Sequence, residues 1–232
     1  MQEYHAKLIA LRDLAPEVRH FVFEVAGTGR VDFTPGQFVS VTERIGGRDV
    51  TRAYSIASPP DGKCIELCLN RVADGLVSPH LFDLRPGDSV RVSEPLGYFV
   101  PRRPLSDSVF IATGTGIAPI RSILHHVLRK GTGRRLTLLF GARYEARLLY
   151  RQEFEKLASE HPNFRFLPAL SRPDEFWHGR TGHVQAHLDE VLGDSHDLDV
   201  YVCGLKAMVD DVRAELKRRG FDRKRIIYEK YD

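Results

Sequence analysis

The order of apolar segments changes near residue 104, and this change limits the folds that the chain can adopt. Before this point, short strand-like runs follow one another, separated by turns rich in Gly and Pro. After it, strand-like runs alternate with segments of helical periodicity. Successive strands indicate an antiparallel barrel, whereas alternating strands and helices indicate a parallel sheet with right-handed crossovers. We therefore predict two domains, residues 1–103 and residues 104–232, each long enough to bury a core.

In the first domain, β-branched and aromatic residues gather in short runs. Ile65, Leu67 and Leu69 alternate with less apolar neighbours, the period of a half-buried strand. Pro35-Gly36 and Pro86-Gly87 mark turns between such runs. The predicted strands are 18–25, 37–42, 52–57, 64–70 and 89–93. At this spacing we expect an antiparallel six-stranded β-barrel.

The second domain is predicted to be α/β and doubly wound around a parallel five-stranded sheet. Its expected strands are 109–112, 136–140, 164–170, 200–203 and 226–228. Its expected helices are 119–130, 151–160, 184–192 and 206–219. The Pro-flanked segment Pro101-Arg102-Arg103-Pro104 is the expected connector between the two domains.

Charge excludes some functions. The chain has 34 Lys and Arg against 31 Asp and Glu, a balance too even to indicate nucleic-acid binding. Basic residues cluster locally at Arg102-Arg103, Arg134-Arg135 and residues 218–225. Such clusters are either solvated surface or a docking face for an acidic protein.

Cysteine content and hydropathy exclude further classes of function. Cys64, Cys68 and Cys203 are too few for the four ligands that a protein-bound iron–sulfur cluster usually needs. No metal site is expected, because His and Cys lack zinc-like spacing. The sequence contains no nucleophile-elbow motif, so a hydrolase is not expected either. No apolar run is long enough to span a membrane, and the polar start at Met1-Gln2 lacks a signal pattern, so we expect a cytoplasmic protein.

A glycine-rich motif, Gly114-Thr115-Gly116-Ile117-Ala118-Pro119, follows a predicted strand and opens a predicted helix. Glycines at this turn let a pyrophosphate approach the backbone, and the helix start supplies free N–H groups. Pro119 suits the first helical turn, although the dinucleotide fingerprint has a third Gly there. A tight strand-to-helix turn without a ligand fits the same residues.

Three further segments carry candidate binding groups. In Arg52-Ala53-Tyr54-Ser55, the Arg fork suits a phosphate and the Tyr ring suits a flat ligand, although an ordinary strand fits too. Gly75-Leu76-Val77-Ser78 is either a second anion-binding turn or simple helix capping. Cys203-Gly204-Leu205-Lys206 lies at the carboxyl end of a strand, where ligands bind in α/β sheets, but Cys203 is also compatible with plain core packing.

Together and in this order, the four motifs resemble those of the ferredoxin–NADP reductase family. The resemblance implies FAD as cofactor, with Arg52 at its pyrophosphate, Tyr54 stacked on the flavin ring and Ser55 near flavin N5. It implies that Gly75 to Ser78 contact the FAD phosphates and that Gly114 to Pro119 hold the nicotinamide nucleotide.

The same resemblance assigns residues to the hydride-transfer site. Cys203-Gly204-Leu205-Lys206 is similar to a segment of plant-type members whose Cys lies against the nicotinamide. Glu229-Lys230-Tyr231 resembles their terminal Glu-x-Tyr, whose ring covers the flavin, although Asp232 follows here. Ser55, Cys203, Glu229 and Tyr231 are the expected catalytic residues.

We expect NADPH as donor, with NADH possible. A 2′-phosphate needs Arg partners, and Arg143, Ser171, Arg172 and Arg180 follow the strands where the adenosine ribose should lie. Arg172→Glu and Arg180→Glu should weaken NADPH binding selectively. Some NADH-using oxygenase reductases also carry Gly-Ala-Arg and Ser-Arg-Pro at these places.

The expected reaction moves a hydride between NAD(P)H and FAD and single electrons to or from a ferredoxin- or flavodoxin-like carrier on another polypeptide. One alternative is the NADH-dependent reductase component of an oxygenase system. A second is a free-flavin reductase, although such enzymes lack the FAD-holding residues that Arg52 and Gly75 to Ser78 match. A third is a non-catalytic electron-transfer or assembly subunit.

Overall fold

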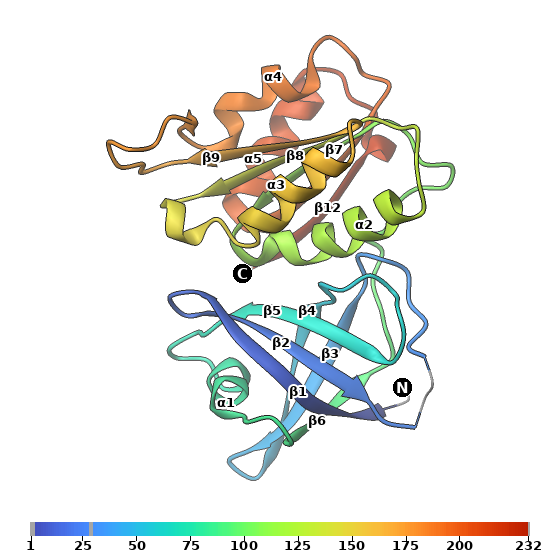
Figure 1. Cartoon of the computed structure of the whole chain (residues 1–232), viewed down its shortest axis with the longest axis vertical. Coiled ribbons are helices and arrows are strands. Elements are labelled where there is room, and N and C mark those ends of the chain that lie inside the picture. Colours follow the sequence, from blue (N-terminus) through green and yellow to red (C-terminus); the bar gives the residue numbers. More distant parts are fainter. Residues whose placement is uncertain (1–2, 28–29, 232) are drawn as a thin grey trace.

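The computed structural model describes residues 3–27 and 30–231, so Met1, Gln2 and Asp232 lie outside the described residues. Two layers of structure stack on each other (Figure 1). An antiparallel barrel-like sheet forms one layer, and a parallel sheet with helices forms the other. The C-terminal strand β12 ends between the two layers, beside the barrel.

The first sheet has six strands in the order β4-β3-β6-β1-β2-β5, all antiparallel neighbours. The strands are β1 (Glu3–Ala15), β2 (Val18–Val25), β3 (Phe38–Ile45), β4 (Arg48–Ser55), β5 (Cys64–Asn70) and β6 (Ser89–Ser93), with one short helix, α1 (Val77–Asp83). The six-stranded fold class is confirmed. The strand that the sequence did not indicate is β1, which has Ala6 and Leu8 fully buried among mostly exposed residues.

The second sheet is parallel, in the order β10-β9-β8-β7-β11-β12. Its strands are β7 (Ser108–Thr113), β8 (Leu136–Ala142), β9 (Phe164–Leu170), β10 (Arg180–Thr181), β11 (Asp199–Leu205) and β12 (Ile226–Tyr231). Five correspond to the five predicted strands. The sixth, β10, has only two residues and pairs with the end of β9, which is too short a segment for any period to indicate.

Helices cover both faces of the parallel sheet, which confirms the doubly wound arrangement. The helices are α2 (Ile117–Arg129), α3 (Arg151–Glu160), α4 (Leu188–Leu192) and α5 (Lys206–Arg218), with 3-10 turns η1 (Gly114–Gly116), η2 (Glu145–Arg147), η3 (Val184–His187) and η4 (Arg223–Arg225). The helix expected at 184–192 is divided into η3 and α4. Helices α4 and α5 pack on the face away from the barrel, and α2 and α3 face the barrel (Figure 1).

The layers share a continuous core. Ile120 and Leu124 of α2 belong to the same buried cluster as Val18, Ala57 and Cys68 of the barrel. Helix α2 is therefore one of the elements that join the parallel sheet to the barrel. No helix among the described residues is long and apolar enough to cross a membrane.

The segment that connects β6 to β7 contains no strand or helix beyond an isolated bridge at Leu96. The division of the chain between residues 103 and 104 falls within this segment and stays a prediction.

Candidate functional site

The four residues predicted to be catalytic lie together where the two layers meet. The Ser55 hydroxyl, at the end of β4, donates to Glu229 Oε1 at 2.9 Å and accepts from the Tyr231 hydroxyl at 2.6 Å. Tyr231 also shares a side-chain hydrogen bond with Cys203. Strands β11 and β12 pair in register, with Cys203 opposite Glu229, so both strands present their ends to Ser55. Barrel and parallel sheet thus build one cluster.

Burial shifts the pKa of three side chains in this cluster. Burial raises the pKa of the Cys203 thiol and of the Tyr231 hydroxyl well above their ordinary values. Burial also raises the pKa of Glu229, against the opposing effect of the Ser55 hydrogen bond. No ion pair within the described residues involves Glu229. Burial without a neighbouring cation therefore disfavours the charged forms of the side chains around Ser55.

The glycine loop lies directly behind Cys203. A Cβ on Gly116 would stand 2.4 Å from the Cys203 carbonyl oxygen, so only glycine allows η1 to pack on β11. Gly114 has a φ of 55° and open space where a Cβ would be, so its backbone is approachable. The buried Thr113 Oγ1 has no hydrogen-bond partner in the described chain. An open glycine at the start of a helix leaves backbone N–H groups accessible to an anionic ligand.

The flavin motif occupies the edge strand β4. Arg52 is exposed, and among the described residues its guanidinium donates only to the neighbouring Thr51 carbonyl, at 2.8 Å. Tyr54 is half-buried against the barrel core, and burial raises the pKa of its hydroxyl to about 12. Ala53 lies exposed between them. The free Arg fork and the partly covered ring fit a phosphate and a flat ring, respectively.

The second phosphate motif is a compact turn at the start of α1. Ser78 is buried, and its hydroxyl accepts from the Val72 backbone N–H at 3.0 Å, which leaves its own proton free to donate. A Cβ on Gly75 would meet the Val72 carbonyl oxygen at 3.1 Å. Leu76 is exposed and Val77 buried, and no side chain caps the helix. The capping interpretation therefore lacks its hydrogen bond.

The predicted adenosine-side residues follow β8 and β9. The Arg172 backbone N–H donates to the Arg143 carbonyl at 2.9 Å, and Ser171 donates to Ala142 at 2.9 Å, so the two loops run side by side. Arg143 and Arg172 are exposed, and no ion pair in the described chain engages either. The Arg180 guanidinium, in contrast, binds both carboxylate oxygens of Glu190.

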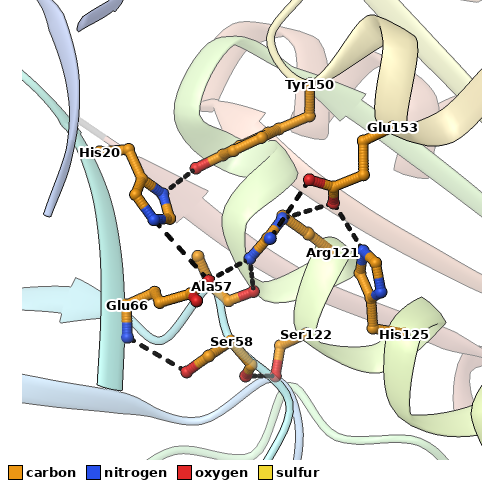
Figure 2. A network of polar contacts seen from close by, with 9 residues as sticks. All are labelled: His20, Ala57, Ser58, Glu66, Arg121, Ser122, His125, Tyr150 and Glu153. Atoms are coloured by element: carbon orange, nitrogen blue, oxygen red, sulfur yellow. Dashed lines mark hydrogen bonds and ion pairs between the residues drawn. The ribbon is translucent and has the colours of Figure 1, made fainter. Parts of the chain in front are cut away.

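A second cluster that joins the layers was missed by the sequence analysis (Figure 2). The Arg121 guanidinium, from α2, donates to both carboxylate oxygens of Glu153, at 2.6 and 3.2 Å. It also donates to Glu66 Oε2 at 2.5 Å and to the Ala57 carbonyl at 2.8 Å. Burial alone would raise the pKa of Glu153, but the hydrogen bond to His125 and the charge of Arg121 lower it to about 2.

His20 and Tyr150 complete this cluster. Their Nδ1 and hydroxyl groups lie 2.8 Å apart, and the Arg121 guanidinium carbon lies 4.8 Å from the centre of the Tyr150 ring. Burial lowers the pKa of His20 to about 4. The available sequence signal is Arg121 itself, which shares one helical face with the fully buried Ile117 and Leu124. A lone Arg on an apolar stripe needs a buried counter-ion.

Comparison with known proteins agrees with this arrangement. Residues 5–100 match the family described as oxidoreductase FAD-binding domain, and residues 110–214 match that described as oxidoreductase NAD-binding domain. The whole chain is 42% identical over 242 residues to ferredoxin–NADP reductase B of Sorangium cellulosum, covering 98% of that protein. The chain belongs to the ferredoxin–NADP reductase family. The predicted resemblance and the FAD and nicotinamide cofactors are thereby confirmed.

Reductase components of oxygenase systems are also similar. The phenol hydroxylase P5 protein of Acinetobacter pittii is 32% identical over 96% of this chain, which spans 64% of that relative. Among solved structures, the Amycolatopsis cytochrome P450 reductase GcoB superposes with a TM-score of 0.88 at 32% identity, over 99% of this chain and 69% of GcoB. As a family member, the protein is an oxidoreductase that transfers electrons from a nicotinamide nucleotide through FAD.

Proposed function

We propose that the protein is a ferredoxin–NADP reductase that exchanges single electrons with a ferredoxin- or flavodoxin-like carrier, in the cytoplasm. The observation that carries this proposal is the cluster of Ser55, Cys203, Glu229 and Tyr231, drawn from both layers. In this cluster, Ser55 at the end of the flavin motif meets residues of β11, the strand on which the glycine loop packs, and of its neighbour β12. The full-length similarity to a ferredoxin–NADP reductase supports the choice of carrier.

A bound flavin supplies the conversion of a two-electron hydride into single electrons, and the protein supplies position. Arg52 and the turn from Gly75 to Ser78 hold phosphate oxygens in this proposal, and Tyr54 covers the ring. The unpaired Arg52 fork and the free Ser78 proton support these roles. Gly114 to Pro119 hold the nicotinamide nucleotide, with open space at Gly114 in support.

Ser55 orients the reacting rings in this proposal. Its hydroxyl is both donor and acceptor, so Glu229 and Tyr231 together determine where its proton and lone pair point. Hydride transfer needs donor and acceptor atoms about 3–3.5 Å apart. When Tyr231 leaves, the hydrogen bond to Glu229 still sets the direction of this buried hydroxyl, and the lone pair that accepted from Tyr231 becomes available to a ring.

Tyr231 acts as the gate, and Cys203 and Glu229 line the nicotinamide pocket. The Tyr231 ring is partly buried and is held by hydrogen bonds to uncharged side chains rather than by an ion pair. Displacing it therefore separates no charges. When Tyr231 leaves this position, the Ser55 hydroxyl is exposed to an incoming ring. A Cβ on Gly204 would stand 2.4 Å from Thr113 Oγ1, so a glycine is needed beside Thr113.

Nucleotide choice rests on the loops after β8 and β9. Arg143 and Arg172 lie side by side and unpaired, as a 2′-phosphate site requires, so we propose NADPH as the donor. Arg172→Glu should raise the Kd for NADPH about 10- to 100-fold, the loss of a charge-assisted hydrogen bond, and leave the Kd for NADH within about twofold.

Arg180→Glu serves as the matched control for this test. Arg180 is already bound to Glu190, so it contributes to a phosphate site only if Glu190 releases it. We therefore revise the sequence-based expectation that Arg180→Glu is selective for NADPH, and propose that this substitution changes the affinity for the two nucleotides alike. Equal losses of NADPH and NADH binding in Arg172→Glu would refute the NADPH assignment.

Anaerobic reduction of the purified yellow protein tests the function itself. Flavin absorbance is followed over a concentration series of NADPH and of NADH, and then with oxidised ferredoxin or flavodoxin as acceptor. We expect bleaching with a clear NADPH preference and reoxidation by the carrier. A colourless protein that reduces added free flavin would support a free-flavin reductase, and absence of turnover with any acceptor would support a non-catalytic subunit.

The second candidate is the NADH-dependent reductase component of an oxygenase system. The similarity to the phenol hydroxylase P5 protein and to GcoB favours it. An NADH preference in the same titration, together with electron transfer to an oxygenase rather than to ferredoxin, would select this candidate.

A further inference from the structure

Helix α2 connects the two cofactor motifs mechanically. It begins at Ile117, directly after the Gly114–Gly116 turn, and carries Arg121 and Ser122 one turn further on. Both side chains are buried, with 8% and 0% of their surface exposed, and both point toward the barrel. Any movement of the glycine loop along this helix is therefore transmitted to whatever these two residues hold.

What they hold is the chain that leaves the flavin motif. The Arg121 guanidinium donates to the Ala57 carbonyl at 2.8 Å, and the Ser122 hydroxyl donates to the Ser58 carbonyl at 2.6 Å. Ala57 lies two residues after Ser55. Two consecutive helical residues thus bind two consecutive carbonyls next to the residue proposed to align the rings.

The same two residues, Ala57 and Ser58, are also held from the barrel side through other atoms. The Ala57 N–H donates to the Glu66 carbonyl at 2.7 Å, and the Glu66 N–H donates to the Ser58 hydroxyl at 3.1 Å. The Glu66 carboxylate in turn accepts from Arg121 at 2.5 Å (Figure 2). The strand exit therefore has hydrogen bonds on both sides, which leaves it little freedom to shift.

Only an Arg provides this geometry. Arg121 makes four hydrogen bonds, two to Glu153, one to Glu66 and one to Ala57, and the planar fork directs them to three different elements. The Tyr150 ring lies against the guanidinium and limits its tilt. A Lys would keep the charge, but its single ammonium cannot reach all three partners.

We propose that Arg121 and Ser122 are positioning residues for hydride transfer, because they set the distance between the nucleotide held at the glycine loop and the ring held beside Ser55. The inference rests on the proposed function, in which transfer occurs across this junction. A displacement of about 1 Å at a reacting pair costs about a hundredfold in rate. Residues that serve only to hold domains together would change stability and leave the rate alone.

Arg121→Lys and Ser122→Ala test the proposal in the flavin-loaded protein. Stopped-flow reduction by NADPH gives the limiting hydride-transfer rate separately from the nucleotide Kd. We expect Arg121→Lys to lower the limiting rate about 10- to 100-fold and Ser122→Ala to lower it less, with the Kd within about twofold. A primary isotope effect with 4-deuterated NADPH should confirm that the slowed step is hydride transfer.

Arg129→Lys is the matched control. Arg129 lies on the same helix and also reaches the barrel, through an exposed ion pair with Asp61 at 2.6 Å, but it touches no part of the flavin motif. Its limiting rate should stay within about twofold of the unsubstituted protein. If Arg121→Lys lowers only the thermal midpoint, or raises only the Kd, the positioning role is refuted.

A triple variant tests the same proposal if the single Arg121 variant fails to fold. Arg121→Met with Glu66→Gln and Glu153→Gln removes the buried charges together, so it should fold without leaving an unpaired ion. We expect it to transfer hydride as slowly as Arg121→Lys, and a normal rate in it would overturn the proposal. Failure of the proposed function would be recognised earlier, because the unsubstituted protein would then be reduced by neither nucleotide.

Discussion

The two clusters that join the barrel to the parallel sheet are built from opposite chemistry. At the proposed hydride-transfer site, Ser55, Glu229 and Tyr231 make a chain of hydrogen bonds without a counter-ion, and burial raises the pKa of Glu229. In the Arg121 cluster, Glu153 has Arg121 and His125 beside it, and its pKa is lowered to about 2. Two half-buried glutamates therefore differ because only one has a cation within reach.

This difference indicates that the two clusters have different roles. A buried ion pair is costly to separate, because each charge left behind is unpaired in a medium of low polarity. A hydrogen-bonded set without an ion pair rearranges at lower cost. The charged cluster is suited to hold the layers in one relation, and the Ser55 cluster, which has no ion pair, is suited to open when a ring enters. Four predictions test this contrast, in order of decreasing effect.

Arg121→Met should produce the largest loss. It leaves the half-buried Glu66 and Glu153 carboxylates without their cation, which costs up to about 3–5 kcal/mol of unfolding free energy. The exposed Arg129→Met should cost at most about 1 kcal/mol, since surface ion pairs contribute little. Denaturant unfolding of both variants measures the contrast, and equal losses would remove the distinction between a buried and an exposed bridge.

Acid should weaken the charged cluster. The pKa of His20 falls from 6.5 to about 4 on folding, so the unfolded chain binds more protons between these values. Stability should decrease as the pH falls through that window, by at most about 3 kcal/mol from this group. Glu153 adds a loss of the same sign between pH 4.5 and about 2.

Unfolding midpoints at pH 7, 5.5 and 4.5 check the effect of His20. His20→Gln should flatten the dependence, whereas His178→Gln, at an exposed position, should leave it unchanged. An unaltered pH dependence in His20→Gln would show that other groups govern acid stability.

Ser55→Ala should affect rate more than stability. It removes the hydroxyl that donates to Glu229 and accepts from Tyr231. We expect hydride transfer to slow about tenfold, the equivalent of one hydrogen bond of about 1.4 kcal/mol, with unfolding changed by about 1 kcal/mol. Stopped-flow reduction measures the rate, with Ser89→Ala on the exposed side of β6 as control. An unchanged rate would argue against alignment by Ser55.

Glu229→Gln should give the smallest effect, with a pH dependence opposite to that of His20. The raised pKa means that the folded state binds more protons than the unfolded chain above pH 4.5. The contribution of Glu229 to stability is thus present at low pH and is lost as the pH rises through its folded value. The variant should melt at a higher temperature than the unsubstituted protein at pH 8 and lose that advantage at pH 4.

Local patterns predicted much of the fold. Val18–Val25, Cys64–Asn70 and Arg151–Glu160 have the predicted bounds, because alternation or helical periodicity together with flanking turns is enough to define such elements. β1 and β10 were missed for a different reason. β1 contains a continuous apolar run, Leu8 to Leu11, in place of the alternation that marks a half-buried strand, and β10 exists only because β9 offers it a neighbour.

The features of the candidate site can likewise be separated into those that local patterns predicted and those that they did not. The sequence by itself determined the residue types and their order: the glycine loop, the flavin motif, and the ends at Cys203 and Tyr231. These signals are short-range, because a turn or a strand end depends on a few neighbouring residues. They were sufficient to indicate the family and its cofactors.

Only the tertiary structure decided which glutamate is paired and which is not. Arg121 and Glu153 are 32 residues apart in the chain, and Arg121 and Glu66 are 55 apart. Electrostatic interactions depend on distance in space and on burial, neither of which a local pattern records. The fold therefore determined that Glu153 is ionised beside Arg121, and that Glu229 faces Ser55 without a cation at the junction of the two layers.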